Sequence, residues 1–317
     1  MLPILSGAPW LIAHRSMLGI NQPYKVTLNG QDYVLWQNSN GEISALNNIC
    51  PHLQASLADG WICQERNTIT CPFHAIEFDG QGRLYQNGNF STQAITEPLE
   101  LTVIDDYIWT YNGLAAKIPI SSLLTRITKG FEFIGVAGIK SIKGDFLSNL
   151  LINYDYNHQN GTHRESFKIK DVAVSDYEEQ GYTTKLSQTI TRDENTLQEI
   201  INNPALLIIP KKFTNQFEYA FPCLTSFIAQ IPIGQIIQIH ALYPETEAQT
   251  KTFVMLFGRF KNTIIGSFLK KSVLKAADEI IRQDTNAIEK SYKRSIPKIR
   301  LPNEEIMFYA EKLYQEW

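Results

Sequence analysis

Two short segments combine cysteine and histidine in a pattern that suits a metal cluster. Cys50-Pro51-His52 and Cys71-Pro72-Phe73-His74 each supply one thiol and one imidazole, with 18 residues between the two segments. Two thiolates suit an iron that stays ferric and two neutral imidazoles suit an iron that is reduced, so the set predicts a [2Fe–2S] cluster. Replacing two cysteines by two histidines on one iron raises the reduction potential above that of a four-cysteine ferredoxin. We therefore expect a cluster that accepts electrons from a low-potential carrier and passes them to a second centre.

A structural zinc site is the alternative, because zinc also binds cysteine and histidine. Zinc fingers commonly pair cysteine with cysteine and histidine with histidine, whereas each pair here is mixed and each cysteine precedes a proline. The iron–sulfur interpretation is favoured, and a zinc-stabilised binding module stays open; the colour of the protein would decide between them. Cys63 and Cys223 match no ligand position and are expected to be small buried residues.

The two segments resemble the Rieske signature, C-x-H followed by C-x-x-H. The resemblance is to the oxygenase or ferredoxin branch, because Ala55 and Phe73 stand where cytochrome bc-type Rieske proteins carry a further disulfide. This chain departs from the oxygenases at Leu53-Gln54, where Arg-Gly is usual, and at Ala75-Ile76, where Gly-Trp is usual. The resemblance implies a [2Fe–2S] cluster held by Cys50, His52, Cys71 and His74.

A second group of possible ligands lies in Asp155-Tyr156-Asn157-His158-Gln159-Asn160-Gly161-Thr162-His163. Activation of dioxygen at iron(II) needs two histidines and one carboxylate on one face. On an unbroken helix His163 would point about 140° away from His158, but Asn160-Gly161 favours a helix end between them. Asp155 is expected one helical turn before His158 on the same face. An isolated histidine pair of this kind is more often structural, and the upstream cluster motif is what favours a metal site.

The third ligand has to be a distant carboxylate. In a helix predicted at 267–292, the apolar residues fall on one face at about 100° per residue, and Asp284 lies near the middle of that face. Asp278 lies at its margin, and Glu279 is expected on the opposite, polar face. A buried carboxylate is costly unless it is paired or bound to a metal. Asp284 is therefore the candidate, with a buried local cap as the alternative.

The pattern Asp-x2-His-x4-His resembles the iron-binding segment of Rieske-type non-haem iron aromatic-ring-hydroxylating oxygenases, and Gln283-Asp284 resembles their late aspartate segment. The resemblance implies His158, His163 and Asp284 as ligands of a mononuclear iron. It implies Asp155 as the bridge that carries electrons to His158 from the His74 of a neighbouring subunit. A homotrimeric ring is implied as well, because the two metals of one subunit are expected to be too far apart.

The elements that must position these residues change in character near residue 116. Short strands are predicted before it, at 24–28, 31–36, 42–46 and within 101–111, with Asn29-Gly30 as a hairpin turn. After it we expect helices at 146–160, 267–292 and 303–317 and strands at 167–174, 183–191, 205–209, 224–231, 236–243 and 252–258. Strands followed by packed helices predict an α+β fold with an antiparallel sheet. The resemblance implies an all-β Rieske domain at 1–115 and a helix-grip (START-like) catalytic domain at 116–317.

Composition sets the broad class of protein. The 317 residues suit two domains, and a net charge of −3 gives no basic excess for nucleic acid. No segment approaches the run of about 18 apolar residues that a membrane span needs. Four cysteines are too few for a disulfide scaffold, which favours a reducing, cytoplasmic setting.

The resemblance implies a Rieske mono- or dioxygenase that uses dioxygen and electrons from a ferredoxin or an NAD(P)H-dependent reductase. Hydroxylation, dihydroxylation or oxidative demethylation of a small organic substrate is expected. A Rieske electron-transfer protein without catalysis is the alternative, which an iron content above two per chain would exclude. Two further histidines, His14 and His240, are interpreted as structural. Five aromatic residues fit either a substrate pocket or core packing: Phe213, Phe217, Tyr219, Phe221 and Phe227.

Overall fold

The computed structural model of the chain describes residues 3–290 and 299–317. It divides into two compact units. The N-terminal unit runs to Ile120 and takes in Pro244–Glu247, and the C-terminal unit consists of Ser121–Tyr243 and Ala248–Trp317. The domain boundary expected at residue 115 stays a prediction.

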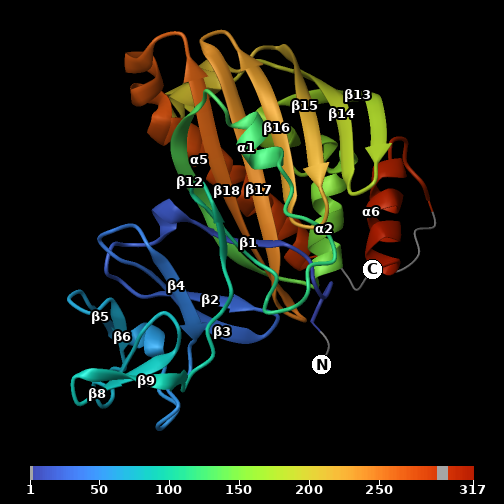
Figure 1. Cartoon of the computed structure of the whole chain (residues 1–317). Helices are drawn as coiled ribbons and strands as arrows, with labels where there is room; N and C mark the ends of the chain where they lie inside the picture. The colour runs from blue at the N-terminus through green and yellow to red at the C-terminus, as the bar shows by residue number, and fades with distance from the viewer. Residues whose placement is uncertain (1–2, 291–298) are drawn as a thin grey trace. The chain divides into compact units, whose positions relative to one another are not determined.

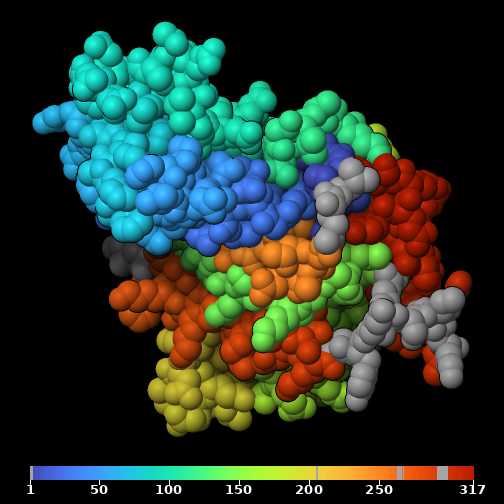
Figure 2. Space-filling view, turned by 90° about the horizontal axis from the view of Figure 1, so that it is seen from below, coloured from blue at the N-terminus to red at the C-terminus, as the bar shows by residue number. Residues whose placement is uncertain are grey.

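The N-terminal unit is built from three antiparallel sheets of short strands (Figure 1). The first joins β1 (Trp10–His14), β11 (Tyr107–Thr110) and β10 (Thr102–Ile104), and the second joins β2 (Tyr24–Leu28), β3 (Gln31–Gln37) and β4 (Ile43–Asn47). The third contains β5 (Trp61–Cys63), β6 (Thr68–Thr70), β7 (Glu77–Phe78), β8 (Arg83–Gln86) and β9 (Asn89–Ala94). Two single-turn helices, η1 (Arg15–Met17) and η2 (Leu57–Asp59), complete the unit. Figure 2 shows its residues, in blue to cyan, as one continuous surface.

The hairpin predicted at Asn29-Gly30 is confirmed. Both residues have positive φ, 51° and 81°, as the favoured two-residue turn requires. Their backbone N–H groups donate to the carbonyl oxygens of Pro244 and Glu245 at 2.8 and 2.6 Å. These bonds explain why a short segment from late in the chain belongs to the N-terminal unit.

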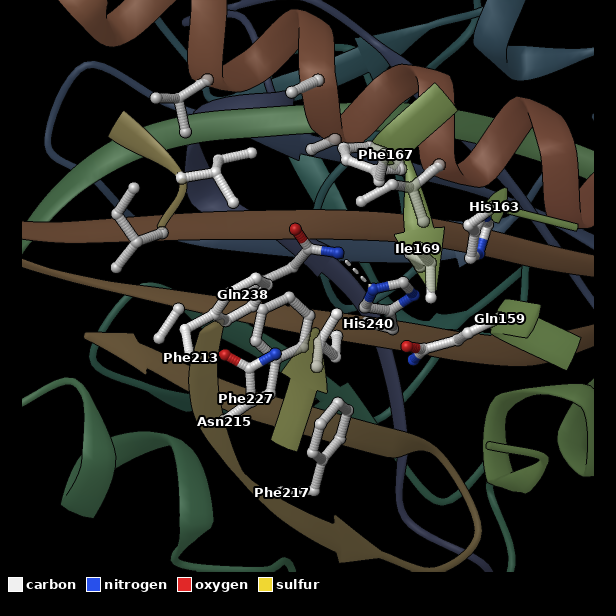
Figure 3. A pocket seen from close by; sticks show the side chains of 18 of the residues that line it. Gln159, His163, Phe167, Ile169, Phe213, Asn215, Phe217, Phe227, Gln238 and His240 are labelled. Atoms are coloured by element: carbon white, nitrogen blue, oxygen red, sulfur yellow. Dashed lines mark hydrogen bonds between the residues drawn. The ribbon is translucent and has the colours of Figure 1, made fainter. Parts of the chain in front are cut away.

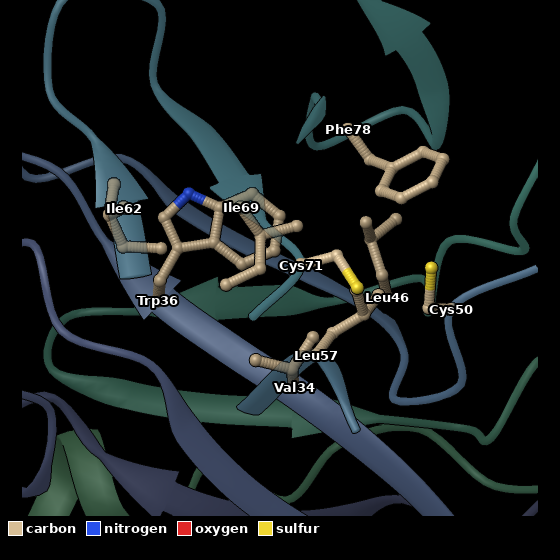
Figure 4. Packing of buried hydrophobic residues seen from close by; sticks show 9 residues of the cluster. All are labelled: Val34, Trp36, Leu46, Cys50, Leu57, Ile62, Ile69, Cys71 and Phe78. Carbon is tan, nitrogen blue, oxygen red and sulfur yellow. The ribbon is translucent and has the colours of Figure 1, made fainter. Parts of the chain in front are cut away.

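The core of the N-terminal unit encloses the two cysteines of the predicted cluster. Trp36 is fully buried at its centre, and its indole N–H donates to Asn67 Oδ1 at 3.1 Å. Apolar side chains from five strands and η2 therefore keep water away from the two sulfur atoms (Figure 4). The buried members of this cluster are Val34, Trp36, Leu46, Cys50, Leu57, Ile62, Ile69, Cys71 and Phe78.

The C-terminal unit is one seven-stranded antiparallel sheet with a long helix on one face. The strand order is β12-β18-β17-β16-β15-β14-β13, so consecutive strands are neighbours except where β12 closes the far edge. The strands are β12 (Glu132–Lys143), β13 (Ile169–Gln180), β14 (Thr183–Arg192), β15 (Lys212–Ala220), β16 (Leu224–Ile231), β17 (Gly234–Thr246) and β18 (Gln249–Phe260).

Helix α5 (Thr263–Lys290) packs against this sheet through the apolar face that the sequence predicted. Figure 1 shows it running behind β12 and β18. Strand and helix residues meet in one buried cluster: Ile134, Ala137, Val254, Leu256, Leu269, Val273, Ala277 and Ile281. Gly138 permits the contact, because a Cβ there would lie 1.9 Å from Ile281 Cδ1. The predicted α+β fold is confirmed, with a helix gripped by an antiparallel sheet.

Smaller helices connect the strands: α1 (Leu123–Ile127), α2 (Phe146–Tyr154), η3 (Asn157–Asn160), α3 (Arg164–Phe167), α4 (Leu197–Asn202), η4 (Pro204–Ile208) and α6 (Glu305–Gln315). Helix α6 packs on α2, where the rings of Phe146 and Tyr314 stack with their centroids 6.5 Å apart. Among the helices within residues 3–290 and 299–317, none combines the length and the apolar character that crossing a membrane requires.

Two predicted elements differ from the structure. The strand predicted at 205–209 is wrong, because this segment forms the helical turn η4. A short apolar run between two prolines carries no period that separates strand from helix. The helix predicted at 146–160 ends at Tyr154, and the last two residues of the helix predicted at 267–292 lie outside the described residues. Two strands were missed: β12, which register shifts interrupt, and β15, whose aromatic residues fitted two interpretations.

Candidate metal centres and active site

Two loops of equal construction present the four predicted cluster ligands. In the first, Cys50 N–H donates to Ala55 O at 2.8 Å and Gln54 N–H donates to Cys50 O at 2.9 Å. The second repeats both bonds, from Cys71 to Ile76 at 2.8 Å and from Ala75 to Cys71 at 3.0 Å. Each loop thus turns its cysteine inward and its histidine outward by the same local hydrogen bonds.

The side chains of the two loops converge in pairs. Cys50 and Cys71 are each 1% exposed, and their mutual proximity adds to burial in raising the pKa of the Cys50 thiol. His52 and His74 are exposed, with their Nδ1 atoms 3.2 Å apart. Two ligands on one tetrahedral metal lie about 3.4 Å apart when each bond is about 2.1 Å. The spacing fits two histidines that share an iron, with two buried thiolates for the other.

Both cluster loops contain a residue other than glycine in the left-handed region. Gln54 has φ of 60° and Ala75 has φ of 53°. These are the positions where the sequence departs from the glycines usual in oxygenases, and the backbone conformation that favours glycine is kept. A side chain in this region costs roughly 1–2 kcal/mol, so the departures lower stability without altering the course of the loop.

The second predicted group also converges. His158 lies in η3, His163 directly before α3 and Asp284 on α5, and one potential ligand atom from each lies within 4.8 Å of the others. The two Nε2 atoms are 3.2 Å apart, and Asp284 Oδ1 is 3.5 Å from His158 Nε2 and 3.1 Å from His163 Nε2. Adjacent ligands of an octahedral metal with bonds of about 2.1 Å are about 3.0 Å apart. The three atoms therefore fit one triangular face of a metal ion.

The electrostatics of this group suit a cation. Burial opposes ionisation of Asp284, yet the adjacent imidazoles of His158 and His163 hold its pKa well below the usual value. Burial also opposes the charge on His158, but Asp284 raises the pKa of that histidine. Asp284 Oδ1 is buried without a hydrogen-bond partner. A buried carboxylate is stable only when paired or metal-bound, and a metal at the centre of the triangle would meet that requirement.

This segment contains two helix ends, of which the one at Asn160, the last residue of η3, lies where the sequence predicted it. Helix α2 ends at Tyr154, and the next residue, Asp155, has φ and ψ of −86° and 112°, outside the helical region. Its Oδ1 accepts from Asn157 N–H at 2.8 Å, a turn in which an aspartate side chain competes with the helix for backbone donors. Gly161, the expected stop, has φ of −111° and no left-handed cap. The expectation that Asp155 lies one helical turn before His158 is therefore wrong.

The Nδ1 atom of each histidine is held by a hydrogen bond, which turns Nε2 towards the predicted metal. His158 Nδ1 donates to the backbone carbonyl oxygen of Asp155, and His163 Nδ1 donates to Gln283 Oε1 at 2.8 Å. Both Nε2 atoms are therefore left to face the third ligand, as in most histidine metal sites. The Asp155 carboxylate itself is used in the turn.

Sequence reasoning missed the residues that support His163. Gln283 Nε2 donates to Glu279 Oε1 at 2.6 Å, and Glu279 also accepts from Arg282 Nε at 2.8 Å. Glu279 was expected on the polar face; its side chain is 36% exposed and reaches Gln283 from there. The available signal was the spacing of four residues between Glu279 and Gln283, which places them side by side on a helix.

A largely apolar cavity of about 220 Å³ opens beside the three predicted ligands. Phe213, Phe217 and Phe227 line it from the sheet (Figure 3), whereas Tyr219 and Phe221 belong to the core. His240 lines it as well, and the structural interpretation of this histidine stays a prediction. Burial lowers the pKa of His240 to about 4. His14 is buried in β1, and its Nδ1 lies 2.8 Å from Ser16 Oγ.

Comparisons with known proteins give relatives for the N-terminal unit and for the whole chain. Residues 9–97 match the family model of the Rieske [2Fe-2S] domain. The dicamba O-demethylase oxygenase component of Stenotrophomonas maltophilia is 26% identical over 311 residues, covering 88% of this chain and 86% of the relative. The chain thus contains a Rieske domain and is similar over most of its length to a Rieske oxygenase. A 4beta-methylsterol monooxygenase of Methylococcus capsulatus is 23% identical over 85% of this chain and 74% of its own length.

Solved structures share the fold of the whole chain. Dicamba monooxygenase bound to dicamba superposes with a TM-score of 0.79 at 17% identity, covering 99% of this chain and 98% of the other. A mutant of Pseudomonas putida NdmA with theobromine gives 0.68 at 13% identity, over 99% and 90%. The Rieske domain implies a [2Fe–2S] cluster, and one of the similar solved structures, dicamba monooxygenase, is described with non-haem iron. The two ligand sets described above fit these two groups.

Proposed function

We propose that this chain is a Rieske oxygenase that oxidatively demethylates a small ring compound, with hydroxylation of the same kind of molecule as the second possibility. The observation that carries the proposal is that three potential ligands meet at the edge of an apolar cavity. Demethylation is preferred because the relative matched over 88% of the chain is named an O-demethylase. Dioxygen, an organic substrate and electrons from a ferredoxin or reductase are the partners of such an enzyme.

The proposal assigns the four cluster ligands by burial. Cys50 and Cys71 would hold the enclosed iron, and His52 and His74 would hold the outer one. The exposed edges of the two imidazoles then offer the shortest route for electrons into and out of the cluster. We place the Rieske domain at residues 1–115 and the catalytic domain at 116–317.

His158, His163 and Asp284 would hold the mononuclear iron, which supplies the reductive activation of dioxygen beside the cavity. The chain's own contribution is positional. The backbone carbonyl oxygen of Asp155 and the amide of Gln283 orient the two imidazoles. The phenylalanines of β15 and β16 exclude water and hold the substrate body.

Electron delivery is proposed to cross between subunits of a homotrimer. The route would run from the His74 of one subunit to His158 of the next, through Asp155. Two features support this route: the exposure of His74 and the hydrogen bond that joins Asp155 to the His158 ring. A mixed assembly tests it: turnover should reappear when Cys71→Ser subunits, which lack the cluster, assemble with Asp284→Asn subunits, which lack the iron. No recovery in verified mixed trimers would contradict the route.

The decisive experiment on the reaction is oxygen uptake with a generic ferredoxin and reductase across a panel of methoxy- and methylamino-substituted ring compounds. Product masses separate demethylation from hydroxylation. His158→Ala should keep the paramagnetic signal of the reduced Rieske cluster and abolish turnover. Asn160→Ala, an exposed change in the same turn, should keep both. Turnover that survives His158→Ala would sink the assignment of the iron site.

A further inference from the structure

One wall of the cavity carries polar side chains that no feature of the fold requires. They lie on the inner face of the sheet, where Asn215, Thr225, Gln238 and His240 alternate with outward-facing residues. Gln238 Nε2 lies 2.6 Å from His240 Nε2 (Figure 3). The amide N–H donates, so that ring nitrogen accepts and the imidazole is neutral. Thr225 is the cross-strand neighbour of His240, which extends the polar region along the sheet.

Several of these groups have no partner within the described chain. Asn215 and Thr225 are each 4% exposed, and neither Asn215 Oδ1 nor Thr225 Oγ1 makes a hydrogen bond. Gln188, the cross-strand neighbour of Asn215, is fully buried with both amide atoms unpaired. Buried polar atoms without partners are rare and costly. Asn215 points into the cavity with only the small Ala229 opposite it on the next strand, so a ligand can reach its amide.

The rest of the wall is apolar and suits a ring. Phe217 and Phe227 are cross-strand neighbours with their ring centroids 5.2 Å apart, and Val273, Ala277 and Ile280 face them from α5. A cavity of about 150 Å³ holds a benzene molecule. The 220 Å³ available here therefore fits a substituted single ring or a small bicyclic compound.

We infer that the substrate is a ring compound with a carbonyl or amide group, which Asn215 and the Gln238–His240 pair bind while the ring lies against Phe227. The inference rests on the proposed function of the site and narrows its substrate class.

A matched pair of probes tests the inference by binding alone. 4-Methoxybenzamide and 4-methoxytoluene have similar shapes and differ in the amide group. We expect calorimetric titration of the anaerobic, cluster- and iron-loaded protein to give at least a tenfold lower Kd for the amide. An equal or lower Kd for 4-methoxytoluene, or no binding of the amide at millimolar concentration, would overturn the inference. Because no turnover is involved, a failure of the proposed oxygenase reaction would be seen separately, as absent oxygen uptake by protein that binds the amide.

Two variants and a control locate the binding group. Asn215→Leu should raise the Kd of the amide about tenfold, the value of one lost hydrogen bond. The melting temperature should stay the same or rise, because Oδ1 has no bond to lose in the empty protein. Gln238→Met, which keeps the length of the side chain, should weaken amide binding in the same direction. Gln216→Leu, on the exposed face of the same strand, should change nothing. A fall in melting temperature without a change in Kd would assign Asn215 a structural role instead.

Discussion

The two metal-binding regions of this molecule are assembled in opposite ways. Each cluster loop is six residues long and holds itself in shape by two backbone hydrogen bonds. The mononuclear site draws its ligands from η3, from the residue before α3 and from α5, which lies more than a hundred residues later. A local motif fixes the first site, whereas the second exists only after the helix packs onto the sheet. Damage to packing should therefore affect the two centres unequally.

Cys71→Ser should have the largest effect and should be confined to the N-terminal unit. A serine hydroxyl stays protonated and cannot replace the thiolate that binds the cluster iron. The cluster should therefore be lost, and with it all turnover. The absorption and paramagnetic signals of the Rieske cluster measure the loss. The mononuclear iron should still bind, because its ligands lie in the other unit. Loss of both metals would show that the two sites do not assemble independently.

Asp284→Asn should have the opposite effect, which is loss of the mononuclear iron with the cluster retained. The amide keeps the shape of the side chain but removes the charge that two imidazoles and a metal share, so iron affinity should fall at least about 100-fold, beyond what outer-shell changes cause. Iron analysis should drop from three to two per chain while the cluster spectrum stays unchanged. Asp278→Asn is the matched control, at an exposed carboxylate on the same helix. Equal loss from both variants would mean that the helix, rather than the ligand, was damaged.

Acid should destabilise the C-terminal unit through His240. Burial lowers its pKa to about 4, against about 6.5 in the unfolded chain. The unfolded state therefore binds more protons between these values, so this contribution is complete above pH 6.5 and is lost as the pH falls towards 4. The full shift is worth on the order of 3 kcal/mol. Denaturant unfolding at several pH values in this range measures the free energy of unfolding. His240→Gln should make that free energy depend less steeply on pH. An unchanged slope would place the titration elsewhere.

Gln283→Leu should weaken the second site without removing a ligand. It deletes the acceptor of His163 Nδ1, and changes of this kind cost about 10–100-fold in metal affinity. Chelator competition would measure the effect. Arg282→Gln, which leaves Gln283 in place, is the comparison and should have a smaller effect. A Gln283→Leu protein with normal affinity would show that packing alone orients the imidazole.

The smallest effect is expected in the two cluster loops, where a change to glycine should stabilise the protein. Gln54→Gly or Ala75→Gly relieves a left-handed conformation that costs roughly 1–2 kcal/mol, minus up to about 1 kcal/mol for the entropy of glycine in the unfolded chain. Each should raise the free energy of unfolding by about 0.5 kcal/mol with an unchanged cluster spectrum. Gln64→Gly, at an exposed turn position without positive φ, should lower it. Destabilisation by all three would show that loop strain is absent.

The sequence alone predicted more of the fold than of the cavity. Strands with turn residues at their ends were predicted within a residue or two, as at Asn29-Gly30, because turn chemistry is local. The apolar face of α5 was also readable, since helical periodicity places Val273, Ala277 and Ile281 together. Strand β12 was missed because its glycines belong to bulges that exist only against β18 and α5. The roles of the seven predicted ligands stay predictions, although the structure brings each set together.

Residue identity and spacing by themselves determined the two cluster loops, because every bond that shapes them lies within six residues. They also picked out Asp284, since a carboxylate on an apolar helical face is conspicuous in the sequence. Only the tertiary structure decided that Glu279 and Gln283 support His163, and that His240 joins Asn215 and Gln238 on one wall. Which strands are neighbours, and in what register, follows from packing of the whole sheet, and no local pattern carries that information.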